Sequence, residues 1–154
     1  MPELKNILYK VSLTSSVGDM SLDVKGICFD SRKVEKGFLF IAVKGTQSDG
    51  HEYISKAIDL GVVAVVCETL PDTIHDKVTY VAVKNSAEAL GVIASNFFGN
   101  PSEKLKLIGV TGTNGKTTVT YLLESIWKEE QRNPGVIGTI EYRYGGKRVE
   151  APMT

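Results

Sequence analysis

A glycine-rich segment in the last third of the chain has the residue types of a phosphate-binding loop. The heptapeptide GTNGKTT contains Gly112, Gly115, Lys116 and Thr117. Glycines let backbone N–H groups converge on an anion, and the N-terminus of a following helix adds a favourable dipole. A lysine can neutralise the β- and γ-phosphates of a nucleotide, and the hydroxyl of Thr117 can hold Mg²⁺. The spacing therefore predicts a nucleotide-binding loop.

The match to the common Walker pattern is partial. In G-x-x-x-x-G-K-[ST], Val110 stands where the first glycine belongs, and only the core G-x-x-G-K-T is present. The alternative is a tight strand–helix turn that carries a surface lysine. The surroundings favour the nucleotide site, because we expect an apolar strand at 106–110 before the loop and a regular amphipathic helix after it.

This helix is expected over residues 116–131. Its apolar residues follow the i, i+3, i+4, i+7, i+8 rule of a helix with one buried face, at Val119, Leu122, Leu123, Ile126 and Trp127. Glu124 and Lys128 form an i, i+4 pair that we expect on the solvent side. Beyond the helix, GVIGTI predicts a strand, and EYRYGGKRVEAP predicts a hairpin that turns at two glycines.

Strands and helices alternate in the first hundred residues. We expect strands at 27–29 and 38–43, with a polar loop between them, and two more in VVAVVCE and VTYVAV. The continuous apolar run in VVAVVCE is typical of a strand buried on both faces. Residues 1–24 are weakly patterned and predict a short helix and a loop. The alternation indicates an α/β fold with mainly parallel pairing.

Two helices of this region have clear start and stop signals. Asp49 can cap the first, with Glu52 as its capping-box partner, and Gly61 can end it. Asn85 and Glu88 repeat the capping logic for the second. Its apolar stripe comprises Leu90, Ile93, Ala94, Phe97 and Phe98, and Gly99 and Pro101 follow as stop signals. The polar stretch GNPSEK then predicts a boundary between domains at 1–102 and 103–154.

The composition excludes several classes of protein. Lysine plus arginine equals aspartate plus glutamate at 18 each, and 42% of the 154 residues are hydrophobic. We therefore expect a globular protein with no nucleic-acid partner and no membrane attachment. Tyr142 and Tyr144 alternate with Arg143, which could suggest base stacking, but the neutral net charge favours one face of a hairpin.

The cysteines and histidines predict no metal site. Cys28 and Cys67 lie in apolar runs, which indicates free buried thiols in a reducing compartment rather than a disulfide or a metal pair. His51 and His75 have no metal-ligand spacing to them. We interpret His51 as a polar residue of a first helical turn rather than as a catalyst. These features favour a cytoplasmic location.

The loop and its surroundings resemble the Mur ligase superfamily. GVTGTNGKTT after an apolar strand is similar to the ATP loop of these enzymes, which join an amino acid or peptide to a carboxylate. The stretch from FDSRKVEKGFLFIAVKG to GVVAVV resembles the UDP-binding domain of the members that add the third residue of the peptidoglycan peptide. The resemblance covers nearly the whole chain. It implies a small N-terminal UDP-binding α/β domain followed by the start of a P-loop α/β domain.

The resemblance also implies roles for particular residues. It assigns the UDP-linked substrate to one set, at Phe29, Ser31, Thr46, Gln47, Ser48 and Thr154. It assigns ATP to the loop, at Gly112, Thr113, Asn114, Gly115, Lys116, Thr117 and Thr118. Lys116 is the expected catalytic residue, and Thr117 is the expected Mg²⁺ ligand. An ordinary loop with a local salt bridge at Asp30-Ser31-Arg32, and a solvated turn at residues 47–48, are the alternatives.

The implied activity is ATP-dependent amide-bond formation. The glutamate carboxylate of UDP-MurNAc-L-Ala-D-Glu would be phosphorylated, and an amine of diaminopimelate or L-lysine would attack the acyl phosphate. We expect this chain to be the N-terminal portion of a monomeric enzyme and to be inactive by itself. A stand-alone, non-catalytic UDP- or nucleotide-binding module is one alternative. Another Mur ligase, such as the D-Ala-D-Ala adding enzyme, is a second.

Overall fold

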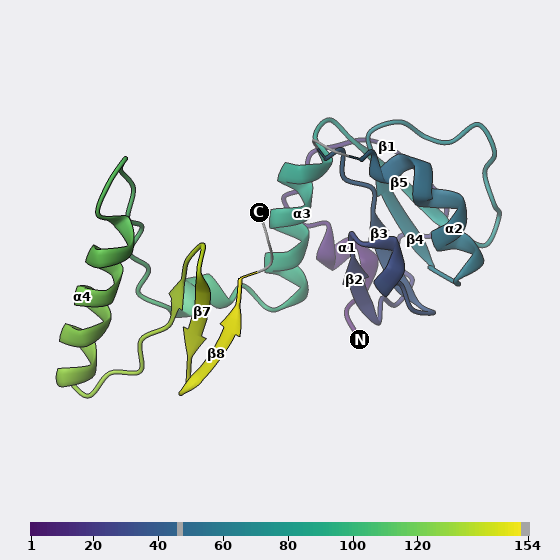
Figure 1. The fold of residues 1–154 in the computed structure, drawn as a ribbon. Helices are drawn as coiled ribbons and strands as arrows, with labels where there is room; N and C mark the ends of the chain where they lie inside the picture. Colours follow the sequence, from purple (N-terminus) through teal and green to yellow (C-terminus); the bar gives the residue numbers. More distant parts are fainter. Residues whose placement is uncertain (46–47, 152–154) are drawn as a thin grey trace. The chain divides into compact units, whose positions relative to one another are not determined.

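The computed structural model describes residues 1–45 and 48–151, which form two compact units. The first unit runs from Met1 to Lys106 and the second from Leu107 to Thr154. Figure 1 follows the chain through both of them. Within the described ranges, no helix has the length and apolar character that crossing a membrane requires.

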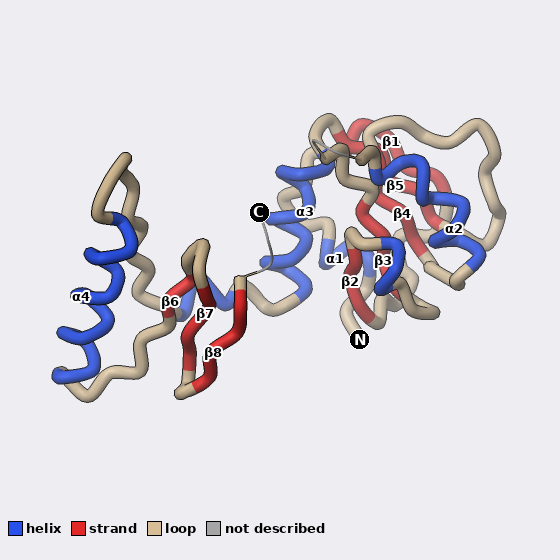
Figure 2. Tube along the Cα trace, viewed as in Figure 1, coloured by secondary structure: helices blue, strands red, loops and turns tan. Residues whose placement is uncertain are grey.

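A five-stranded sheet forms the centre of the first unit (Figure 2). Its strand order is β1-β5-β4-β3-β2. The strands are β1 (Leu13–Val17), β2 (Gly26–Cys28), β3 (Phe38–Ile41), β4 (Ala64–Cys67) and β5 (Thr79–Val83). Neighbouring strands from β2 to β5 pair in parallel, and β1 pairs antiparallel with β5. The predicted α/β class with mainly parallel pairing is therefore confirmed for this unit.

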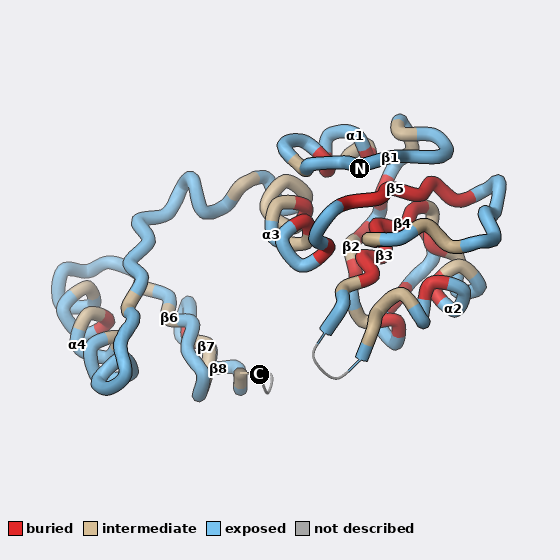
Figure 3. Tube along the Cα trace, turned by 90° about the horizontal axis from the view of Figure 1, so that it is seen from above, coloured by how far each residue is buried: buried red, intermediate tan, exposed pale blue. Residues whose placement is uncertain are grey.

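Helices lie on both faces of the sheet. One face packs against α1 (Leu4–Ile7) and α3 (Ser86–Phe97), and the other against α2 (Ile54–Asp59). Successive residues of β3 point to opposite faces, so Leu39 joins the first core and Phe40 the second. Every residue of β4 and β5 is buried, as Figure 3 shows. Burial on both faces explains the uninterrupted apolar runs in these strands.

The predicted cap of α3 is confirmed, and the cap predicted for the earlier helix lies at the 3-10 turn that precedes it. Asn85 accepts hydrogen bonds from the N–H groups of Ala87 and Glu88 at the start of α3. The side chain of Asp49 accepts from the N–H of His51 at the start of the 3-10 helix η2 (Gly50–Tyr53), which leads directly into α2. Gly61 follows α2 with φ +90°, as a helix-ending glycine requires. Two further 3-10 helices are η1 (Ser31–Lys33) and η3 (Pro101–Lys104).

Two expectations for this unit were wrong. Residues 1–24 contain the edge strand β1 in addition to a helix, and all five residues of β1 are exposed. An exposed edge strand has no buried face, so its sequence carries no alternating apolar pattern. The predicted stripe of α3 is also too wide, since Ile93 is fully buried whereas Phe98 is 67% exposed.

The second unit combines one helix with a small antiparallel sheet. Helix α4 spans Lys116–Glu129, and the sheet contains β6 (Val136–Ile137), β7 (Glu141–Tyr144) and β8 (Lys147–Glu150) in that order. The hairpin from β7 to β8 turns at Gly145 and Gly146, whose φ values are +53° and +76°. Both values are positive, as the tight turn of a two-residue hairpin requires. The predicted hairpin is confirmed.

Two expectations for the second unit were wrong. Residues 106–110 are irregular rather than a strand, and Leu107 and Ile108 are exposed. A strand needs neighbours for its backbone hydrogen bonds, and within the described residues none of the eight strands pairs with this run. The apolar residues of α4 are largely exposed. The buried residue of this helix is Glu124 instead. The expected solvent position of Glu124 is therefore corrected.

Candidate functional site

An open cavity of about 630 Å³ lies where β2 and β3 end. Ligand sites of parallel α/β sheets lie at the carboxyl ends of the strands. The segment after β2 contributes Phe29 and Ser31, and the segment after β3 contributes Ser48. Three residues that the sequence assigned to a UDP-linked substrate thus line one cavity. Thr46, Gln47 and Thr154 lie outside the described residues.

The 3-10 turn after β2 presents Ser31 at the cavity. Asp30 caps this turn, because its Oδ1 accepts a hydrogen bond of 3.0 Å from the N–H of Arg32. The guanidinium of Arg32 also donates to both carboxylate oxygens of Asp30, at 2.9 and 2.8 Å. These bonds lower the pKa of Asp30 from 3.8 to about 2. Ser31 is the first residue of the turn, and it is 8% exposed.

Two antiparallel backbone arms, at residues 43–45 and 48–50, form the hairpin that is the opposite wall. The N–H of Gly50 donates to the Val43 carbonyl at 2.9 Å, and the N–H of Gly45 donates to the Ser48 carbonyl at 3.0 Å. A Cβ at position 50 would lie 2.7 Å from both the nitrogen and the oxygen of Val43. The two arms of this hairpin therefore approach so closely that only glycine fits at position 50.

The cavity also contains residues that the sequence did not identify. Tyr53 and Lys56 both line it, and they lie three residues apart in η2 and the start of α2. This spacing places two side chains on one helical face. An i, i+3 spacing occurs on any helical face, so it does not by itself indicate a ligand site. Aromatic rings, hydroxyls and a free ammonium group in one cavity suit a nucleoside diphosphate, whose base is flat and whose phosphates are anionic.

The glycine-rich loop lies in the second unit and leads into α4. Gly112 and Gly115 have φ values of +147° and +79°, which favour glycine, and Gly115 is the N-cap of α4. The ammonium of Lys116 donates to the carbonyl of Gly112 and, at 3.4 Å, to that of Thr113. Thr117 and Thr118 belong to the first turn of α4, where backbone N–H groups have no intrahelical partner. The geometry fits a nucleotide phosphate together with a cation.

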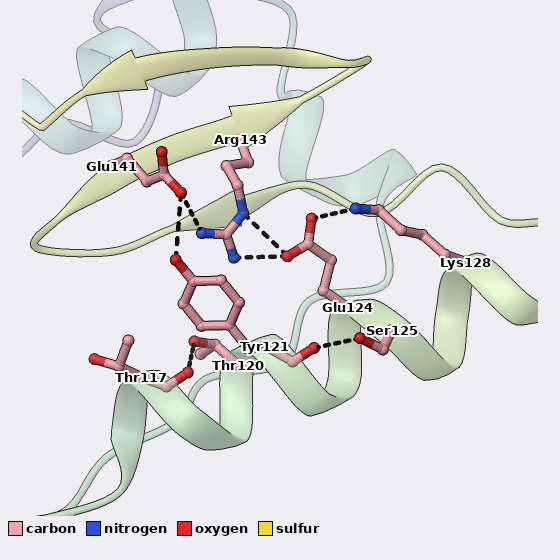
Figure 4. Close-up of polar contacts among 8 residues, drawn as sticks. All are labelled: Thr117, Thr120, Tyr121, Glu124, Ser125, Lys128, Glu141 and Arg143. Carbon is pink, nitrogen blue, oxygen red and sulfur yellow. Dashed lines mark hydrogen bonds and ion pairs between the residues drawn. The ribbon is translucent and has the colours of Figure 1, made fainter.

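A buried charge network holds the hairpin of the second unit against α4 (Figure 4). Nη2 of Arg143 lies 2.6 Å from Oε2 of Glu124, and Nη1 lies 2.7 Å from Oε1 of Glu141. The guanidinium also stacks on the ring of Tyr121, 3.9 Å from its centroid. Lys128 donates to the second oxygen of Glu124 at 2.8 Å. These contacts lower the pKa of Glu124.

The cysteines and Arg143 line neither the cavity at the ends of β2 and β3 nor the glycine-rich loop. Cys28 and Cys67 are free and buried, as predicted, and burial raises the pKa of Cys67 to about 11. In the ranges 1–45 and 48–151, no three His, Cys, Asp or Glu side chains gather as metal ligands would. Arg143 is buried rather than displayed on a hairpin face, so it is not available for base stacking.

Family comparisons match both units. A family model described as "Mur ligase family, catalytic domain" matches residues 23–98, and one described as "Mur ligase middle domain" matches residues 110–154. The chain belongs to the Mur ligase family. The first match contains the cavity at the ends of β2 and β3, and the second contains the glycine-rich loop. Both candidate places of this Mur ligase chain therefore lie inside family regions.

Curated relatives of this Mur ligase chain share one name, UDP-N-acetylmuramoyl-L-alanyl-D-glutamate--2,6-diaminopimelate ligase. The protein from Cytophaga hutchinsonii is 52% identical over 153 residues, which cover 99% of this chain and 32% of the relative. The protein from Aquifex aeolicus is 50% identical over 124 residues, which cover 80% of this chain and 25% of the relative. The chain thus spans about a third or less of the length of these relatives.

Solved structures of Mur ligases have a similar fold. The structure of MurF from Thermotoga maritima in complex with ADP is 30% identical, with a TM-score of 0.53 over 75% of this chain and 27% of that protein. A structure of a UDP-N-acetylmuramoyl-L-alanyl-D-glutamate--2,6-diaminopimelate ligase reaches a TM-score of 0.72 at 23% identity. The latter covers 96% of this chain and 29% of that protein, and it bears on the fold alone.

Proposed function

We propose that this chain is the N-terminal portion of an ATP-dependent amide-bond-forming ligase of peptidoglycan precursor synthesis, of the MurE type. The enzyme would add diaminopimelate to UDP-MurNAc-L-Ala-D-Glu through an acyl phosphate. The single observation that carries this proposal is the cavity at the ends of β2 and β3, which gathers Phe29, Ser31 and Ser48. The shared name of the curated relatives supports the choice of diamino acid.

We assign the UDP moiety to this cavity, with residues 1–102 as the substrate-binding domain. Phe29 and Tyr53 supply aromatic surface for the uracil ring. The hydroxyls of Ser31 and Ser48 and the ammonium of Lys56 can bind the diphosphate. Arg32 is bound to Asp30 through two hydrogen bonds, so its role is to shape the turn that presents Ser31. Thr46, Gln47 and Thr154 remain proposed ligands from the resemblance.

We assign ATP and Mg²⁺ to the glycine-rich loop, with residues 103–154 as the beginning of the ATP-binding domain. Backbone N–H groups from Gly112 to Thr118 can surround the β- and γ-phosphates, and Thr117 can contribute its hydroxyl to Mg²⁺. Lys116 would leave the carbonyls of Gly112 and Thr113 and bind the transferring phosphoryl group. Its charge would then stabilise the transition state, since positioning and electrostatics supply most of the catalysis in phosphoryl transfer.

A second Mur ligase activity has one observation in its favour. Solved MurF structures from Acinetobacter baumannii and Thermotoga maritima are 29–30% identical to this chain. Another structure from Acinetobacter baumannii, also 29% identical to this chain, is that of a UDP-N-acetylmuramoylalanyl-D-glutamyl-2,6-diaminopimelate--D-alanyl-D-alanyl ligase. The 40–52% identity to curated diaminopimelate ligases favours the first candidate. We further propose a cytoplasmic, monomeric enzyme.

A binding experiment on the 154-residue chain tests the substrate assignment. We expect UDP-MurNAc-L-Ala-D-Glu to bind in isothermal titration calorimetry, and Phe29→Ala to weaken binding about tenfold through loss of ring stacking. Phe98→Ala is the matched control, because Phe29 and Phe98 are 62% and 67% exposed and Phe98 lies outside the cavity. No binding by the wild-type chain, or equal losses in both variants, would refute the assignment.

An activity experiment tests the reaction. In a chimera, this chain replaces the matching N-terminal residues of the Cytophaga hutchinsonii ligase, to which it is 52% identical. We expect the chimera to form the diaminopimelate product from UDP-MurNAc-L-Ala-D-Glu and ATP, with release of phosphate. A folded chimera that binds the UDP-linked substrate and makes no product would refute the ligase assignment while leaving the binding assignment intact.

A further inference from the structure

His51 joins two parts of the first unit through both of its ring nitrogens. Nδ1 lies 2.6 Å from Oδ1 of Asp49, in the second hairpin arm at residues 48–50. Nε2 accepts a hydrogen bond of 2.8 Å from the backbone N–H of Glu68, which follows β4. The side chain is 20% exposed. The imidazole therefore bridges the hairpin and the end of a central strand.

This pair of contacts fixes the tautomer of His51. Nε2 faces an N–H donor, so it must carry a lone pair. Nδ1 faces a carboxylate, so it carries the proton and donates it. A proton on Nε2 would remove the acceptor that the Glu68 N–H requires. Sequence reasoning assigned His51 only to a first helical turn and missed this bridge, since Glu68 lies 17 residues further along the chain.

The hairpin has two faces that serve different neighbours. Gly45, Ser48 and Gly50 line the cavity that we assign to UDP. Lys44 and Asp49, which form an isolated antiparallel bridge, line a second cavity of about 390 Å³ together with His51. The bridge made by His51 therefore holds the hairpin from the side opposite the substrate. A side chain bound to the face that carries Asp49 can therefore set the position of the face that lines the substrate cavity.

The far end of the bridge is itself anchored. Oε1 of Glu68 accepts hydrogen bonds of 2.9 Å from both the N–H and the hydroxyl of Ser86, at the start of α3. These bonds lower the pKa of Glu68, and those from His51 lower the pKa of Asp49. The charged groups around the ring are Asp49, Glu68, Lys44 and Asp72, all of which line the second cavity. The carboxylates would attract a protonated ring, whereas the Glu68 N–H would repel it.

We propose that His51 is a positioning residue for the UDP-linked substrate, holding the hairpin arms at residues 43–45 and 48–50 against the carboxyl end of β4. This inference rests on the proposed substrate assignment of the cavity. His51 contacts no group that we assign to substrate, and it acts through Asp49 on Gly45 and Ser48. Loss of the bridge leaves both cores of the unit intact, because His51 belongs to neither.

Two amide variants separate the two arms of the bridge. The amide of His51→Gln reaches the position of Nε2 and can accept from the Glu68 N–H, so it retains the strand contact. The amide of His51→Asn reaches only the position of Nδ1, so it retains the Asp49 contact and loses the strand contact. His51→Gln loses the Asp49 contact, so each variant cuts one arm of the bridge. We therefore expect both variants to weaken binding of UDP-MurNAc-L-Ala-D-Glu about five- to tenfold, as the loss of one hydrogen bond implies. His75→Asn, at the other, exposed histidine, is the matched control.

Amide hydrogen exchange gives a readout that does not need substrate. In His51→Asn we expect faster exchange at Gly45 and Gly50, with unchanged exchange at Val65 in the core and an unchanged midpoint of thermal unfolding. Ring ¹⁵N shifts should show protonated Nδ1 and unprotonated Nε2 in the wild type. Normal exchange at Gly45 and Gly50 in His51→Asn, or binding by both amide variants that equals that of the wild type, would overturn the positioning role. A wild-type chain that shows the exchange pattern but binds no substrate would instead refute the substrate assignment.

Discussion

Arg143 and Glu124 form a buried ion pair between β7 and α4, with Nη2 and Oε2 2.6 Å apart. The two side chains are 8% and 7% exposed. Nε of Arg143 donates to the same carboxylate oxygen at 3.0 Å, and Glu141 accepts from the remaining nitrogen. A charge this well enclosed is costly to leave without its partner. The pair therefore fixes how the hairpin packs on the helix that begins at the glycine-rich loop.

Removing this guanidinium should loosen the second unit. We expect Arg143→Ala to lower its free energy of unfolding by about 2 kcal/mol, because Glu124 would lose its main partner. Trp127 is the one tryptophan of the chain and lies in α4, so urea unfolding followed by its fluorescence reports on this unit. Arg148→Ala, at an exposed arginine of β8, is the control. Equal midpoints for the two variants would contradict a stabilising role for the pair.

The loop lysine should be indispensable for turnover. In the chimera with the Cytophaga hutchinsonii ligase, we expect Lys116→Ala to lower kcat by about a thousandfold or more, since it removes the positive charge on the transferring phosphoryl group. Phosphate release measures the effect. Lys104→Ala, at an exposed lysine outside the loop, should leave the rate unchanged. If Lys116→Ala were nearly as active as the unsubstituted chimera, the catalytic role of Lys116 would be refuted.

Two glycine substitutions should have opposite effects on the first unit. Gly50→Ala places a methyl group 2.7 Å from the backbone of Val43, so we expect a loss of about 1–3 kcal/mol of stability and weaker substrate binding. Gly91→Ala adds its methyl group in open space within α3, so we expect a gain of about 0.5–1 kcal/mol. Thermal unfolding of both variants gives the comparison. Equal shifts of the midpoint would contradict the close approach of the hairpin arms.

The Asp30–Arg32 pair predicts a contribution to stability that depends on pH. The folded pKa of Asp30 is lowered from 3.8 to about 2, mainly by its hydrogen bonds with the Arg32 side chain. The contribution is therefore complete above about pH 4 and is lost as the pH falls towards 2. We expect Arg32→Gln to raise the pKa of Asp30 back towards 3.8, as measured by NMR titration of its carboxyl carbon. An unchanged pKa in that variant would show that Arg32 is not the cause.

The parallel core of the first unit could be predicted because its signals are local. Asn85 and Asp49 cap helices through hydrogen bonds to residues two or three positions away. The runs that form β4 and β5 are buried along their whole length, so their composition alone indicates them. Strand β1 could not be predicted, because its pairing partner lies 63 to 70 residues away, from Val17↔Tyr80 to Leu13↔Val83, and all its residues are exposed.

The second unit was harder to predict because its deciding contacts are not local. Helical periodicity placed Glu124 on the solvent side, yet Arg143 from β7 covers it. Residues 106–110 have the composition of a buried strand, but composition cannot supply a pairing partner. For the candidate sites, the glycine-rich loop could be predicted from its own motif. The family resemblance predicted Ser31 and Ser48 as site residues. Only the structure identified Tyr53 and Lys56, because the fold brings them to the same cavity.

The pairing of β1 with β5 has a consequence for how the first unit folds during synthesis. Leu13 lies opposite Val83, so the first strand to leave the ribosome must wait for the last strand of the sheet before it finds its place. Such non-local pairing slows folding, because a long loop must close before any contact forms. Before β1 pairs, the outer side of β5 is an open edge with which a strand of a neighbouring nascent chain could pair. Strand β1 is thus made first and joins the sheet last, on the side of β5 that stays open until then.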